Sequence, residues 1–239
     1  YAAAIGHYEL ALARFEETGD LDGRGRALDG LAAAHHRRGE FAKAEDRYRR
    51  ALEVKRSLGD RRGEARALNS LGALAEVRGR YRRALSLEHE AIAIYEELGD
   101  RGGMGEAHFN MGSVHFRLGD YALSLESYGR SLEIASELGD RTLMNRVMGG
   151  MGAVYEASGR FDLAQAFYDE CLVLARKSGD SSCVVAALNH HASLHVARGG
   201  NAEARPLIEE AIRALPSHGQ DHLRARSLYL LARTESGAA

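Results

Sequence analysis

Three neighbouring histidines have the spacing that most clearly suggests chemistry. His191 and His195 are four residues apart, so on a helix they would share a face that can hold zinc, and His190 precedes them. No glutamate follows in the pattern of a zinc protease, and no third ligand is evident. His35 and His115 recur with His195 at multiples of 40 residues, which favours a structural role. We therefore predict no metal site.

The patterns of the common catalytic sites are missing as well. We find no phosphate loop, nucleophile elbow, paired catalytic carboxylates or Cys/His dyad, and an enzyme needs convergent groups in a dry pocket. We predict a chain without enzymatic activity and without a cofactor. The two cysteines, Cys171 and Cys183, are too few for a disulfide-rich scaffold. Cys171 is expected to be a buried small residue, and a disulfide between the two is possible but not required.

The composition narrows the class of protein. The chain has 239 residues, of which 45% are hydrophobic and 28% charged, so it is not disordered by composition. A net charge of −2 argues against a general polyanion binder, and no apolar run reaches the length of a membrane span. The chain begins at Tyr1 without an initiator methionine, so we expect it to be a fragment of a longer protein. We also expect a cytoplasmic location.

A 40-residue repeat organises the whole chain. Gly-Asp pairs recur at 19–20, 59–60, 99–100, 139–140 and 179–180. A second series of glycines stands halfway between them, at positions 39, 79, 119, 159 and 199. Two interleaved series over the full length do not arise by chance, so we expect a repeat architecture.

The segments between the glycines have the pattern of amphipathic helices. One segment places Phe41, Ala44, Tyr48, Ala51 and Leu52 at spacings of three and four, which form one stripe on a helix. Glycine after such a stripe favours a left-handed helix end, and the aspartate that follows can cap the next helix. Each Gly-Asp pair therefore predicts a helix end followed directly by a helix start.

This pattern predicts twelve helices in one continuous array. A lone second-type helix fills residues 1–20, five repeats follow, and a first-type helix occupies residues 221–239. The repeats span 21–60, 61–100, 101–140, 141–180 and 181–220. In the last one Asn201 replaces the aromatic residue, Pro206 lies in the first turns, and Pro216 is expected to end the helix early.

Several residue pairs resemble the tetratricopeptide repeat. Leu71-Gly72, Met111-Gly112 and Met151-Gly152 match the family's Leu-Gly in the first helix, and Gly79, Tyr81 and Ala84 match its turn and second-helix start. The repeat is 40 residues long instead of the usual 34, and it resembles the long repeats of spindle-orientation adaptors and bacterial multidomain regulators. The resemblance implies an all-α right-handed solenoid whose first helices line a concave groove that binds peptides.

The resemblance assigns first-helix residues to that groove. Phe109 and Phe116 are seven residues apart and share a helix face, so they are a candidate anchor for a partner, unless they pack against a neighbouring helix. Arginine can hold a carboxylate through two parallel bonds, and asparagine can pair with a peptide backbone. The polar candidates are Arg26, Arg66, Arg146, Asn69, Asn110 and Asn189.

Basic residues gather in the first two repeats. Residues 21–60 hold ten Lys/Arg against seven Asp/Glu, and further arginines surround the next turn. Two interpretations stand, an edge that meets an acidic partner or a solvated face with local ion pairs. The residues in question are Arg37, Arg38, Lys43, Arg78, Arg80, Arg82 and Arg83.

The sequence therefore favours a non-catalytic scaffold that binds a protein or peptide ligand in the groove. One alternative is a sensory or autoinhibitory module of a larger regulator or enzyme, whose active domain lies outside this chain. Another is self-association through an open end of the array. We expect no membrane partner, and nucleic acid is disfavoured by the balanced charge.

Overall fold

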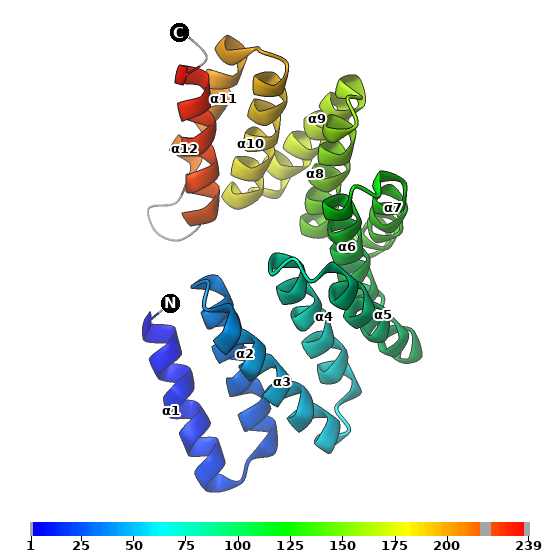
Figure 1. The fold of residues 1–239 in the computed structure, drawn as a ribbon, viewed down its shortest axis with the longest axis vertical. Helices are drawn as coiled ribbons and strands as arrows, with labels where there is room; N and C mark the ends of the chain where they lie inside the picture. Colours follow the sequence, from blue (N-terminus) through cyan, green and yellow to red (C-terminus); the bar gives the residue numbers. More distant parts are fainter. Residues whose placement is uncertain (1, 216–220, 237–239) are drawn as a thin grey trace. The chain divides into compact units, whose positions relative to one another are not determined.

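A computed structural model describes residues 2–215 and 221–236, and all regular structure in those ranges is helical. The described helices are α1 (Ala2–Thr18), α2 (Leu21–Arg37), α3 (Phe41–Leu58), α4 (Arg61–Val77), α5 (Tyr81–Leu98), α6 (Arg101–Leu118), α7 (Tyr121–Leu138), α8 (Arg141–Ala157), α9 (Phe161–Ser178), α10 (Ser181–Ala197), α11 (Asn201–Ala214) and α12 (Asp221–Ser236) (Figure 1). The prediction of an all-α chain with twelve helices is confirmed. Pro216 lies outside the described residues, and none of the described helices is long and apolar enough to cross a membrane.

The Gly-Asp pairs act as the sequence predicts. Gly59 ends α3 in the left-handed conformation, with a φ of 67°, which costs glycine little because it has no Cβ. Directly after it, Oδ1 of Asp60 accepts a hydrogen bond of 2.9 Å from the backbone nitrogen of Gly63 and so caps the start of α4. Oδ1 of Asp100 accepts the equivalent bond from Gly103 at 3.0 Å. The chain thus reverses direction within two residues.

The chain divides into two compact units, residues 1–118 and 119–239, which we describe separately. In the first unit each helix packs on the next, from α1 to α6, and α4 also contacts α6 (Figure 1). Its core consists mainly of leucine and alanine side chains, together with tyrosine, isoleucine and valine, and Leu28, Leu68 and Leu74 are almost completely buried. The first helices α4 and α6 therefore lie against each other, which brings their side chains together.

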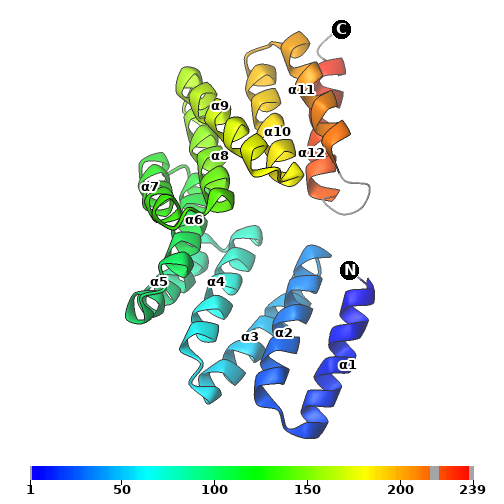
Figure 2. The ribbon, with the colours of Figure 1, turned by 180° about the vertical axis from the view of Figure 1, so that it is seen from behind.

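The second unit repeats this arrangement in α7 to α12. Contacts join α7 to α8, α8 to α9, α9 to α10 and α10 to α11, and the first helix α8 also contacts the first helix α10. At its end α12 packs on both α10 and α11 (Figure 2). Tyr168, Leu188 and Leu194 are fully buried there. Pro206 lies inside α11, in its second turn, and the helix continues to Ala214.

The small residues of the predicted stripe are where helices approach most closely. Ala44, Ala84, Ser124, Ala164 and Ala204, which share one column, are all fully buried. Cys171, in the next small column, is 1% exposed, as predicted. In the first helices the closest approaches use glycine, and a Cβ on Gly152 would overlap the ring of Tyr168. Close packing here requires the absence of a side chain.

Two Gly→Ala substitutions in the second unit separate this packing demand from helix propensity. Gly129 lies in α7 with open space around it, so Gly129→Ala should raise the free energy of unfolding by up to about 1 kcal/mol. Gly152→Ala should lower it by about 1–3 kcal/mol, because the methyl group must displace Tyr168. Urea unfolding curves measure both. Equal stability of the two variants would contradict the close approach.

Candidate functional site

Polar side chains link the first helices α4 and α6 of the first unit. Oγ of Ser113 on α6 donates to Oε1 of Glu76 on α4 at 2.6 Å, and Nε of Arg117 lies 3.9 Å from the same oxygen. One turn away, the side-chain amides of Asn110 and Asn69 contact each other across the two helices. Asn69 and Asn110 are both half-buried, so part of each amide remains accessible.

A fully buried carboxyl group lies beneath the two asparagines. Nδ2 of Asn110 donates to Oε1 of Glu88 on α5 at 3.1 Å. With its nitrogen turned towards Glu88, the amide of Asn69 donates to both carboxyl oxygens, at 3.2 and 2.8 Å. Burial raises the pKa of Glu88 well above its usual value, and the nearby charges of Glu76 and Glu106 act in the same direction. Folding therefore favours the protonated form of Glu88, although the hydrogen bond from Asn110 acts in the opposite direction.

The aromatic pair predicted as an anchor lies on α6, beside this polar row. Phe109 and Phe116 are both half-buried, and each also makes contacts within the chain. Helical spacing places Ser113 between them on the same face, since it is four residues after Phe109 and three before Phe116. The α4–α6 face, which we define by Asn69, Phe109, Asn110, Ser113 and Phe116, therefore combines apolar area with hydrogen-bonding groups.

The three predicted arginines are all exposed, and they lie in different surroundings. Arg26 on α2 forms an ion pair of 3.3 Å with Asp22, one turn earlier on its own helix. Arg66 lies on α4, one turn before Asn69, and makes no ion pair within the described part of the chain. Arg146 lies on α8 of the second unit and has interactions within the chain. Arg66 alone adjoins the α4–α6 face.

Asn189 does not have the accessible position that the groove assignment expected. Its side chain is fully buried, Nδ2 donates to the carbonyl oxygen of Leu223 at 3.4 Å, and Oδ1 accepts from Oγ of Ser227 at 2.8 Å. Both partners belong to α12. The terminal helix thus covers this part of α10, which sequence reasoning could not foresee because the repeat pattern alone treats all first helices as equivalent.

A second polar cluster joins α8, α9 and α10 in the second unit. The hydroxyl of Tyr168 donates to Glu156 at 2.8 Å, and Oγ of Ser193 donates to the other oxygen of that carboxylate at 3.1 Å. The ring of His190 stacks on Tyr168 with a centroid distance of 5.1 Å. Burial lowers the pKa of His190 to about 3, helped by the charge of Arg226, so the imidazole is neutral.

The histidines and cysteines considered for chemistry have structural surroundings. His191 is buried, with Nδ1 3.2 Å from Gln165 and Nε2 3.5 Å from Asp169. Within the described residues, no group of three or more His, Cys, Asp or Glu side chains is arranged to hold a metal ion. Cys171 and Cys183 are both free and buried, and burial raises the pKa of their thiols to about 12 and about 11.

Glu88 was missed by sequence reasoning, although a signal exists in the repeat. The same column holds Tyr48, Tyr128 and Tyr168, all buried aromatic residues, so an acid there stands out. A Cβ on Gly72 would overlap the carboxyl group of Glu88, just as one on Gly152 would overlap Tyr168. Comparing the columns residue by residue would have found the substitution, but its partners required the structure.

The buried carboxyl predicts a specific pH dependence. Its pKa is raised by folding, so the folded chain holds a proton that the unfolded chain releases above about pH 4.3, and stability falls as pH rises from there. Glu88→Gln removes this proton exchange. We therefore expect the free energy of unfolding of Glu88→Gln, minus that of the parent, to be larger at pH 8 than at pH 5. This difference should change by at most about 1.4 kcal/mol per pH unit.

Urea unfolding at a series of pH values measures this difference. Glu90→Gln, on the exposed side of the same helix, is the matched control and should follow the parent at every pH. A Glu88→Gln profile parallel to that of the parent would contradict a raised pKa of Glu88.

Comparison with known proteins places this architecture in a family. Models described as tetratricopeptide repeat match residues 1–57, 103–177, 142–217 and 65–98. A comparison with curated protein sequences gives no match.

Several solved structures share the fold. BtubC (BKLC) from P. vanneervenii has a TM-score of 0.72 and 20% identity, over 92% of this chain and 95% of that one. NprR in complex with its cognate peptide NprX has a TM-score of 0.74 and 15% identity, over 96% and 66%. A Rap protein complexed with competence and sporulation factor has a TM-score of 0.68 and 16% identity, over 98% and 69%. With most of its length matched by the repeat models, the chain belongs to the tetratricopeptide repeat family.

Proposed function

We propose that this chain is a protein-interaction scaffold that binds a peptide or an extended segment of a partner protein on the α4–α6 face. The observation that carries the proposal is the combination of Phe109 and Phe116 with the row of amide and hydroxyl groups between α4 and α6. Half-buried aromatic rings contribute most binding energy where they adjoin polar groups that fix a ligand's orientation.

The α4–α6 face offers complementary groups to an extended backbone. The accessible parts of the amides of Asn69 and Asn110 can donate to and accept from peptide groups at once. Their contacts with Glu88 hold them in place before a ligand arrives, so little ordering of the receptor opposes binding. Arg66 lies one turn along α4 and can pair with an acidic side chain of the ligand.

Two structures with the same fold were determined with a bound factor, NprR with its cognate peptide NprX and a Rap protein with competence and sporulation factor. Their identities to this chain are 16% or less, so they support the kind of ligand and not its sequence. The proposal therefore names the face and the ligand class, a peptide with apolar side chains placed to meet the two phenylalanines.

A peptide library displayed on phage supplies ligands for the test. Peptides selected on the chain should bind the Phe109→Ser/Phe116→Ser variant at least about ten-fold more weakly, because the aromatic contact area is lost. Tyr229→Ser changes an aromatic residue that is 62% exposed on α12 and should leave affinity unchanged. Fluorescence anisotropy gives the affinities.

Circular dichroism checks that each variant is helical, and the single variants Phe109→Ala and Phe116→Ala replace the double variant if it fails to fold. Selected peptides that bind all folded variants equally would place the interaction away from the α4–α6 face. Binding that is lost equally in Tyr229→Ser would have the same meaning.

A further inference from the structure

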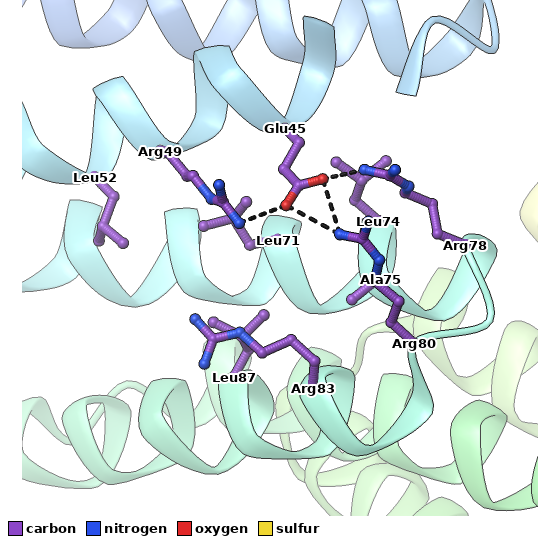
Figure 3. A pocket seen from close by; sticks show the side chains of 10 residues that line it. All are labelled: Glu45, Arg49, Leu52, Leu71, Leu74, Ala75, Arg78, Arg80, Arg83 and Leu87. Carbon is purple, nitrogen blue, oxygen red and sulfur yellow. Dashed lines mark hydrogen bonds and ion pairs between the residues drawn. The ribbon is translucent and has the colours of Figure 1, made fainter. Parts of the chain in front are cut away.

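A second feature of the first unit is a surface hollow lined by several arginines. The second helices α3 and α5 both pack on α4, and between them lies a small hollow of about 90 Å³ that is partly open to solvent. Its floor is apolar and consists of Leu52, Leu71, Leu74, Ala75 and Leu87. The charged side chains around it are Glu45, Arg49, Arg78, Arg80 and Arg83 (Figure 3). We call this the arginine hollow.

The arginine hollow has more positive charge than its one carboxylate can balance. Glu45 accepts from Arg49 at 2.6 Å, from Arg80 at 3.2 Å through both oxygens, and from Arg78. Three guanidinium groups thus share one acid, although each offers five N–H donors. Four arginines and one glutamate leave a local net charge of +3. N–H groups that do not contact Glu45 can therefore donate hydrogen bonds to a second anion.

Arg83 is the arginine best placed to take that anion. It extends from α5 along the opposite side of the hollow from Glu45, with its guanidinium beside Leu87 (Figure 3). Within the described residues it forms no ion pair, whereas the other three arginines all bind Glu45. The N–H donors of its guanidinium group therefore lie next to the apolar side chain of Leu87.

The repeat itself does not demand this arrangement. The column of Glu45 continues with Leu85, Leu125, Gln165 and Arg205, and that of Arg83 continues with Leu123, Leu163 and Glu203, so the pairing of an acid with an arginine at these two positions does not recur. An arginine cluster that served only to build the solenoid would be expected to recur with the repeat. The hollow therefore belongs to one junction, between the first two complete repeats.

We propose that the arginine hollow binds an acidic segment of a partner protein, in which a glutamate or aspartate is followed by a leucine-like residue. Arg83 would hold the carboxylate through its planar fork, together with Arg49 or Arg80, and the apolar side chain would cover the leucine floor. The floor favours a peptide over a phosphate group or nucleic acid, since only an apolar side chain can cover the small apolar area that these largely buried residues leave open. This site is independent of the α4–α6 face.

Peptides of defined composition test the proposal on the full chain. The probe is the rhodamine-labelled peptide acetyl-GSELELSG-amide, and two variants of it replace either both glutamates by glutamine or both leucines by serine. The acidic, leucine-containing probe should bind at least about five-fold more tightly than either variant, because only it uses both the donors and the floor. Fluorescence anisotropy at low ionic strength gives the affinities.

The chain offers a matched pair of charge variants. Arg82 is exposed and directly precedes Arg83 on α5, but it does not line the hollow. Arg83→Gln should weaken binding of the probe about five-fold or more, while Arg82→Gln should change it less than two-fold, although both remove the same charge. The Phe109→Ser/Phe116→Ser variant should bind the probe normally, so failure of this site and failure of the α4–α6 face are distinguishable.

Three results would overturn the proposal. The first is equal weakening by Arg82→Gln and Arg83→Gln, which would indicate nonspecific attraction to a basic surface. The second is equal affinity for the glutamate and glutamine probes. The third is a single-stranded DNA oligonucleotide that binds more tightly than the probe and competes with it, since the ligand would then be a polyanion.

Discussion

The structure depends on one local device, a glycine in the left-handed conformation at the connections between helices, which at every second connection is followed by an aspartate that caps the next helix. Gly59 and Asp60 show it: the first ends α3 without the cost that a Cβ would add, and the second satisfies a backbone nitrogen at the start of α4. Because only the glycine and the aspartate separate α3 from α4, two helices of 18 and 17 residues follow each other directly and pack together. The packing that follows is a consequence of this reversal.

The packing between helices uses the same few contacts with different residues. A glycine of a first helix meets a large side chain of the second helix, as Gly152 meets Tyr168 and Gly72 meets Glu88. Where the large residue is aromatic, the contact is mainly apolar. Where it is Glu88, burial of a carboxyl group requires hydrogen-bonding partners, and Asn69 and Asn110 supply them. The presence of Glu88 at a position where other repeats have tyrosine thus explains why polar side chains lie on the surface above it.

Much of the fold could be predicted from the sequence because its signals are local and repeated. The glycine and aspartate positions mark the helix ends, and the three- and four-residue spacing marks the buried side, as Ala44 and Cys171 illustrate. The all-α fold, the number of helices and the family could therefore be predicted directly from these signals.

The candidate sites were harder to predict because they depend on contacts between repeats. Asn189 and Asn69 occupy the same position of the repeat, yet α12 covers Asn189 completely, whereas Asn69, which contacts Asn110 on α6, remains half-buried. The clustered arginines of the first repeats were evident, but whether they pair with acids or surround a hollow depends on side-chain directions. Two of them, Arg78 and Arg80, share Glu45 with Arg49, which the sequence analysis did not single out, and this sharing is a property of the folded state.

The two-residue reversals also constrain how such a chain can change over evolutionary time. Each residue advances a helix by about 100° around its axis, so one inserted residue would turn the whole following stripe away from its neighbours. The turns have no slack to absorb the error, because the glycine and the capping aspartate are adjacent. Single insertions should therefore be rare in related sequences, while gain or loss of 40 residues at once preserves every contact. We therefore expect related sequences to differ in length by whole 40-residue repeats.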